Sequence, residues 1–172
     1  MMNLPNKLTM FRMVLVPAVM ALMLTGHAVF AVILFIMACI TDFLDGFIAR
    51  KYNLVSSFGK IMDPLADKLL TFGALLCLAV SGYASVWAVM IIISREFFVT
   101  CMRVVAGAKG KVIAASMWGK VKTNVQMFSL IFSIAFCKTL PTATYAVIWA
   151  AAAFTAASWV AYIRENTDVF KD

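Results

Sequence analysis

Six long apolar runs, separated by short polar breaks, dominate the pattern along this chain. Each run is close to the about 20 residues that an α-helix needs to cross the hydrocarbon of a bilayer. A helix in a soluble core would instead carry an apolar stripe opposite a polar face. The pattern predicts an all-α integral membrane protein, a single domain over residues 1–172, with six transmembrane helices near Leu8–Leu24, Ala28–Ala49, Ile61–Ser81, Val86–Ala106, Gly119–Phe136 and Ala143–Ile163.

The composition agrees with lipid as the main solvent of this chain. Of its 172 residues, 64% are hydrophobic and 13% are charged, which is about half the charged share of soluble proteins. No small-residue cleavage site follows the first apolar run, and further runs do, so we interpret this run as a retained helix and not as a signal peptide. The four cysteines stand singly in apolar runs, which argues against a zinc or redox site.

The basic residues indicate which way the predicted bundle lies in the membrane. Six spans place both termini on one side, and only Lys138 lies on the opposite side. By the positive-inside rule, both termini are cytoplasmic. The net charge of +7 then reflects topology and contact with lipid headgroups, so no nucleic acid partner is expected. The cations on the cytoplasmic side are Lys7, Arg12, Arg50, Lys51, Lys60, Lys109, Lys111, Lys120, Lys122, Arg164 and Lys171.

Four aspartates stand in predicted helices, where each charge costs about 2.5–3.5 kcal/mol at mid-span. Asp42 and Asp45 share one face near the cytoplasmic end of the second helix, and Asp63 and Asp67 share one face at the start of the third. Because these helices form an antiparallel pair, the four carboxylates are expected to converge. Four unpaired anions repel one another, so either they keep their protons or cations lie between them. Oxygen ligands favour Mg²⁺, Mn²⁺ or Ca²⁺ over zinc.

Glycines and cations flank these aspartates. Gly46 and Gly59 lie on the carboxylate side, where a missing side chain either admits a ligand or allows close helix packing. Arg50 and Lys60 lie at the headgroup level, where they either extend to lipid phosphates or hold the phosphate of a substrate. The sequence therefore predicts an active site at the cytoplasmic ends of the second and third helices.

The aspartates belong to a longer motif. Residues Asp42–Arg50, followed after eight residues by Gly59–Asp67, contain the pattern DGxxARx(8)GxxxDxxxD without a departure, with Asp42 three residues before its first aspartate. This segment resembles the signature of the CDP-alcohol phosphotransferases. The resemblance implies the six-helix fold of that family, a homodimer, and two divalent ions per protomer, Mg²⁺ or Mn²⁺, bound by the four aspartates. It also implies that Asp67 is the general base.

A shorter segment upstream supports the same family. Residues Asn6–Arg12 resemble an NxxTxxR segment that bacterial members place beside the nucleotide and the acceptor. The resemblance implies that Arg12 contacts the acceptor, and it implies a bacterial-type inner (cell) membrane. Lys60, at the headgroup level beside the aspartates, is expected to contact the acceptor phosphate. The residues implied to contact the CDP-lipid are Asn6, Thr9, Asp45, Gly46, Ala49, Arg50 and Gly59.

The fourth and fifth predicted helices carry further charges. Arg95 lies midway along its helix and forms either a structural ion pair or part of the acceptor site, although adjacent Glu96 is expected to pair poorly with it. Arg103, Lys120 and Lys122 predict a cationic pocket for an acceptor that carries phosphate. The second half of the chain, which contains these two helices, resembles the family members that make phosphatidylglycerophosphate and CMP from CDP-diacylglycerol and sn-glycerol 3-phosphate.

Two kinds of alternative remain open at this point. Other members of the same family make phosphatidylserine, phosphatidylinositol phosphate or cardiolipin, and the acceptor distinguishes them. A divalent-cation or proton-coupled transporter also needs acidic residues within the membrane. Transporters place these residues near the midplane, between two internal repeats. This sequence contains no second pair of acidic helices that would correspond to a second repeat. We therefore predict a metal-dependent transferase of phospholipid biosynthesis whose partners are CDP-diacylglycerol, glycerol 3-phosphate, membrane phospholipid and a second copy of the chain.

Overall fold

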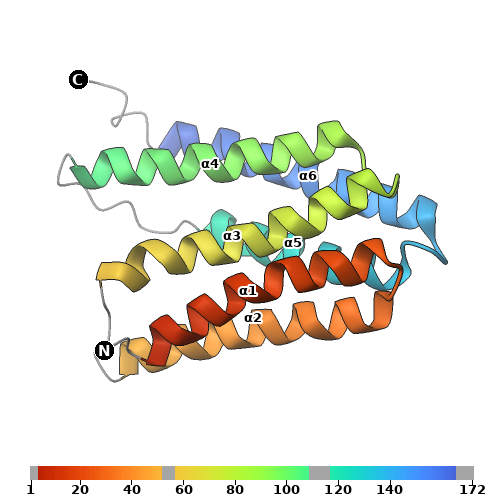
Figure 1. Cartoon of the computed structure of the whole chain (residues 1–172). Helices are drawn as coiled ribbons and strands as arrows, with labels where there is room; N and C mark the ends of the chain where they lie inside the picture. Colours follow the sequence, from red (N-terminus) through yellow and green to blue (C-terminus); the bar gives the residue numbers. More distant parts are fainter. Residues whose placement is uncertain (1–3, 52–56, 109–116, 166–172) are drawn as a thin grey trace.

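Six α-helices make up the part of the chain that the computed structural model describes, which is residues 4–51, 57–108 and 117–165 (Figure 1). All six predicted helices are present. Successive helices run in opposite directions, so the aspartates of the second and third helices lie toward the same end of the bundle (Figure 1). The helices are α1 (Leu4–Leu24), α2 (Ala28–Lys51), α3 (Ser57–Val80), α4 (Val86–Ala108), α5 (Met117–Phe136) and α6 (Pro141–Glu165).

The helices extend beyond the apolar runs at the end of the bundle that carries the aspartates. α2 continues to Lys51 and α3 begins at Ser57, so all four aspartates lie within helices. A helix keeps its internal hydrogen bonds where it leaves the hydrocarbon, which hydropathy alone does not reveal. α6 begins at Pro141, the first helical position, where the missing N–H of proline costs nothing.

Glycine turns close α1 and α3 at the opposite end of the bundle. Gly26 and Gly82 have φ angles of 82° and 77°, in the left-handed region that glycine adopts without strain. The His27 amide donates to the Leu22 carbonyl (2.9 Å), and the Tyr83 amide donates to the Leu78 carbonyl (2.8 Å). These bonds satisfy carbonyls at the ends of the helices, as in a Schellman motif.

The helices pack in two groups that share one apolar core. α1 packs mainly against α2 and α3, and α6 packs mainly against α4 and α5, while α5 also contacts α2 and α3. A Cβ added at Gly73 would lie 2.9 Å from the Met20 sulfur, so this glycine allows α1 and α3 to approach closely. The largest buried side chains of the core include Val19, Phe35, Leu70, Leu75, Leu78, Ile92, Leu130, Ile134 and Ile148.

Large apolar side chains lie on the outside of the bundle, and three charged side chains of the described residues are buried inside it. Trp87 and Phe128 are 76% and 73% exposed, whereas Arg12, Arg95 and Lys122 are buried. A soluble protein shows the opposite distribution. In hydrocarbon, polar groups must find partners within the protein, which this interior provides. The chain is a membrane protein.

Hydropathy by itself identifies fewer spans than the helices suggest. Within the described ranges, α6 alone is long and apolar enough to cross a membrane by length and composition. Shorter apolar stretches occupy Leu8–Leu24, Ala28–Asp42 and Val121–Phe136. α3 and α4 fall short because each carries three charged residues within its apolar stretch.

Candidate functional site

α1 holds the two aspartate helices together. The Arg12 guanidinium forms an ion pair with the Asp42 carboxylate, and the Thr9 hydroxyl donates to Asp63 Oδ1 at 2.5 Å. Thr9 and Arg12 lie about one turn apart on α1, and both are 0% exposed. A single face of α1 therefore binds one carboxylate from α2 and one from α3.

Asp67 lies one turn further along α3, between two groups of charges. Its carboxylate interacts electrostatically with Asp42 and Arg12 on one side. On the other side it interacts with Glu96 and Lys122, from α4 and α5. Asp67 thus connects the aspartates of the first half of the chain to the cations of the second half.

A cavity of about 250 Å³ opens beside Asp67, between α3, α4 and α5. Arg95 and Arg103 of α4 lie on its wall with Asp67, whereas Arg12 is not among the lining residues. Across the cavity, the Lys68 ammonium donates to the Thr100 hydroxyl. The lining residues are Pro64, Asp67, Lys68, Arg95, Glu96, Val99, Thr100, Arg103, Gly119 and Thr123.

Glu96 binds two of the predicted acceptor cations. One oxygen, Oε1, accepts from Arg95 Nη1 at 3.0 Å and also from the Lys122 ammonium. The side chains of Arg95 and Lys122 are 7% and 3% exposed. The expectation that Arg95 and Glu96 pair poorly is wrong, because the long arginine side chain bends around the helix to its neighbour.

Arg103 differs from these two cations. It is exposed on the cavity wall, and no ion pair found within the described ranges includes it. Lys122 instead lines a smaller adjoining cavity of about 30 Å³, which also touches Asp67, Lys68 and Glu96. The region beside Asp67 thus contains four cations: Arg103 and Lys68, which form no ion pair within the described ranges, and Arg95 and Lys122, which share the single negative charge of Glu96.

Three residues of this region were not predicted as site residues: Lys68, Glu96 and Thr100. The cost of a charge within an apolar helix, which singled out the aspartates, applies equally to Lys68 and Glu96. Lys68 also directly follows Asp67 in the motif. Thr100 stands among the polar residues of α4, and its place in the cavity lining and its contact with Lys68 assign it to this region.

Several predicted site residues have side chains outside the described part of the structure. Their backbones lie in α1, α2, α3 and α5. Among the side chains that are described, no three from His, Cys, Asp and Glu lie close enough together to hold a metal ion. The residues whose side chains fall outside are Asn6, Asp45, Gly46, Ala49, Arg50, Gly59, Lys60 and Lys120.

Comparison with known proteins identifies the family. A family model described as CDP-alcohol phosphatidyltransferase matches residues 2–157. The chain belongs to this family. The match extends the resemblance of the Asp42–Asp67 motif across nearly the whole sequence, including the charged residues of α4 and α5. The family predicted from that motif is confirmed.

Relatives within the CDP-alcohol phosphatidyltransferases cover the full chain. A CDP-diacylglycerol–glycerol-3-phosphate 3-phosphatidyltransferase of Bacillus subtilis (strain 168) is 42% identical over 192 residues, which cover 99% of this chain and 98% of that protein. A protein with the same name from Rickettsia typhi is 36% identical over 172 residues, covering 95% of this chain and 97% of its own length. The similarity therefore includes the second half, where the acceptor cations were predicted.

Proposed function

We propose that this chain transfers the phosphatidyl group of CDP-diacylglycerol to sn-glycerol 3-phosphate, forming phosphatidylglycerophosphate and CMP in phospholipid biosynthesis. The observation that carries this proposal is the full-length similarity to relatives named for this reaction. The cavity beside Asp67 supports it, because its cations suit an acceptor that carries phosphate.

The aspartates suit divalent metal ions. Asp42 and Asp63 offer only oxygen atoms as metal ligands. In the structure each carboxylate accepts a hydrogen bond from α1, Asp42 from Arg12 and Asp63 from Thr9. Carboxylate oxygens are the ligands that Mg²⁺ and Mn²⁺ prefer. Asp42, Asp45, Asp63 and Asp67 would hold two such ions per protomer. When bound, the ions neutralise the pyrophosphate of the CDP-lipid and the charge of the departing CMP.

The residues of the chain perform the transfer around Asp67. The acceptor hydroxyl oxygen forms a bond to the phosphorus that carries diacylglycerol, and the bond from that phosphorus to CMP breaks. The Asp67 carboxylate takes the proton of the hydroxyl. Its position between the aspartates and the cations of α4 and α5 supports this role, because the two substrates meet there.

The phosphate of the acceptor is bound by cations of the second half of the chain. Arg103 is the first of these, because it is open to the cavity. Arg95 lies on the same wall and Lys122 lines the adjoining cavity; both bind Glu96, which fixes their positions and balances one of their two positive charges. Lys60 and Lys120 complete the set, and Arg12 acts on the acceptor from the Asp42 side.

The site faces the cytoplasm in this proposal. All six helices span the membrane and both termini are cytoplasmic, as the distribution of basic residues predicts. The diacylglycerol chains stay in lipid while glycerol 3-phosphate enters from water. The CDP group lies along Asn6, Thr9 and the glycine-containing face of α2 and α3, and the chain works as a homodimer in a bacterial-type inner membrane.

The decisive assay measures CMP release from CDP-diacylglycerol by the purified full-length protein in mixed micelles. Glycerol 3-phosphate should support release with Mg²⁺ or Mn²⁺, and a chelator should abolish it. Serine, inositol phosphate and phosphatidylglycerol serve as competing acceptors. Faster release with any of these three would assign the chain to another reaction of the same family, and metal flux into proteoliposomes without CMP release would indicate a transporter.

A further inference from the structure

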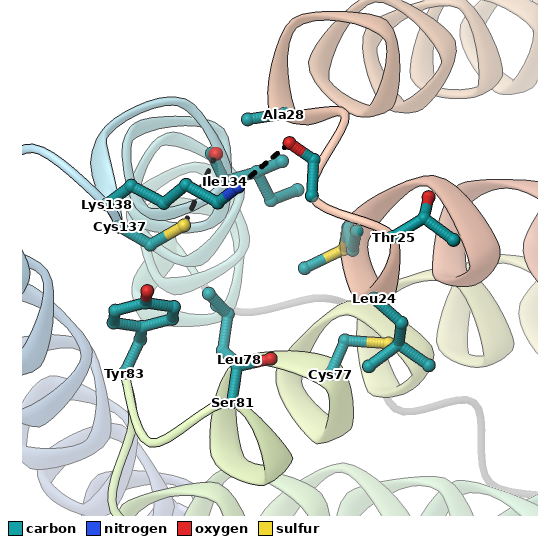
Figure 2. A pocket seen from close by; sticks show the side chains of 12 residues that line it. Leu24, Thr25, Ala28, Cys77, Leu78, Ser81, Tyr83, Ile134, Cys137 and Lys138 are labelled. Carbon is teal, nitrogen blue, oxygen red and sulfur yellow. Dashed lines mark hydrogen bonds between the residues drawn. The ribbon is translucent and has the colours of Figure 1, made fainter.

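A second cavity, of about 280 Å³, lies at the end of the bundle opposite the aspartates (Figure 2). The turn between α1 and α2, the end of α3 and the end of α5 surround it. Its floor is apolar and belongs to the core, since Cys77, Leu78 and Ile134 are all buried. The role proposed for Asp67 does not use this cavity.

Lys138 reaches across this cavity. Its ammonium donates to the Gly26 carbonyl at 3.0 Å, which joins the end of α5 to the turn after α1 (Figure 2). A Cβ at Gly26 would lie only 2.5 Å from the Lys138 nitrogen, so the glycine leaves the space that the ammonium occupies. A lysine that merely extended toward lipid headgroups would not be held over a cavity in this way.

Within the described ranges, no acidic side chain forms an ion pair with Lys138. The turns at this end, residues 25–27, 81–85 and 137–140, contain no aspartate or glutamate. The ion pairs within the described ranges all involve Asp42, at the other end of the bundle, or Glu96, midway along α4. The Gly26 carbonyl takes one of the three ammonium N–H groups and leaves the positive charge unbalanced.

The rim adds hydroxyl groups to this charge. Ser81 and Tyr83 line the cavity, and the Tyr83 hydroxyl points toward Cys137 in Figure 2. The Thr25 hydroxyl, also on the rim, already donates to the Ala21 carbonyl at 2.8 Å. A phosphate oxygen would accept from the ammonium and from the Ser81 and Tyr83 hydroxyls. The apolar floor would lie under the aliphatic part of the same molecule. Phosphate joined to an apolar chain is the chemistry of a phospholipid.

We propose that this cavity binds the headgroup phosphate of an anionic phospholipid from the leaflet at this end of the bundle. A net negative headgroup fits better than a zwitterionic one, because the turns around the cavity offer a cation and no carboxylate for a choline or ethanolamine group. The site is separate from the proposed transfer reaction, since no residue is common to the linings of the two cavities.

Cys137 provides the test, because its thiol lines this cavity. The full-length protein in detergent is treated with N-ethylmaleimide, and alkylation of each cysteine is followed by peptide mass spectrometry. Exposed Cys101 on α4 is the internal control for reagent and micelle effects. If only the lipid-free form reacts, the rate falls by the factor 1 + [L]/Kd, so phosphatidylglycerol at about four times its Kd slows Cys137 about fivefold.

Variants at Lys138 test whether its ammonium binds the lipid phosphate. Lys138→Gln should raise the Kd for phosphatidylglycerol about tenfold or more, as expected for the loss of a charge-assisted hydrogen bond. Lys138→Arg should keep most of the protection. Each rate is compared with and without lipid in the same variant, because the lysine also affects the reactivity of the nearby thiol. CMP release by both variants should match that of the unmodified protein, which verifies their folding.

Four outcomes would overturn the proposal. Equal protection by phosphatidylcholine would mean that the cavity contacts lipids without regard to charge. Equal protection by inorganic phosphate at the same concentration would mean that it binds free phosphate and not lipid. Protection that persists unchanged in Lys138→Gln, or that is absent from the unmodified protein, would remove the assigned role of the lysine.

Discussion

Replacing Arg103 with glutamine tests the acceptor site most directly. Arg103 is exposed on the cavity wall and takes part in no ion pair within the described part of the chain. Its loss should therefore remove a contact with the acceptor phosphate without freeing a buried partner. A charge-assisted hydrogen bond contributes about 1.5–3 kcal/mol. Because solvent screens this exposed side chain, we take the low end, about 1.5 kcal/mol, which is roughly tenfold in KM.

The assay measures CMP release while either substrate is varied. Arg103→Gln should raise the KM for glycerol 3-phosphate and leave both the KM for CDP-diacylglycerol and the Tm nearly unchanged. Arg164→Gln is the matched control, since it removes the same charge from an exposed position near the end of α6. An unchanged acceptor KM in Arg103→Gln, or an equal rise in Arg164→Gln, would refute the assignment of the cavity to the acceptor.

Lys122→Gln should behave differently because Lys122 is buried. The Lys122 ammonium donates to Glu96. After the substitution, Arg95 would be the remaining ion-pair partner of Glu96 among the described residues. The loss should lower the free energy of unfolding by about 1–3 kcal/mol and reduce the Tm, in addition to any change in KM. A Tm equal to that of the unmodified protein would contradict the structural role of this pair.

Other predictions concern the aspartates, the packing and the topology. Asp63→Asn should abolish CMP release at low Mg²⁺ with the Tm retained, whereas Asp67→Asn should lower kcat and keep CDP-lipid binding; equal loss of binding would make Asp67 chiefly a ligand. Gly73→Ala should lower stability by about 1–3 kcal/mol through its contact with Met20, and Met20→Ala should partly restore it; additive losses would contradict this contact. A cysteine at exposed Ser81 should react only with reagent added outside the cell, and labelling from the cytoplasm would reverse the proposed topology.

The motif spacing led to the aspartates without a structure. A helix repeats its faces every three to four residues, which predicts that Asp42 shares a face with Asp45 and Asp63 with Asp67. The structure adds that Asp42 and Asp63, from different helices, both contact α1. The same reasoning did not predict that Thr9 and Arg12 would bind these two carboxylates. Their pairing joins residues 54 and 30 positions apart in the chain, and no local periodicity encodes that distance.

The sequence by itself determined the helices, the family and the residue types of the site, because hydrophobic runs and motif spacing are local properties of the chain. Only the tertiary structure decided how the charges pair. Glu96 binds both its neighbour Arg95 and Lys122 of another helix, while Arg103 stays open to the cavity. Burial at an interface between helices makes an unpaired charge costly, so which cation meets which acid depends on how the helices pack and not on where the residues stand in sequence.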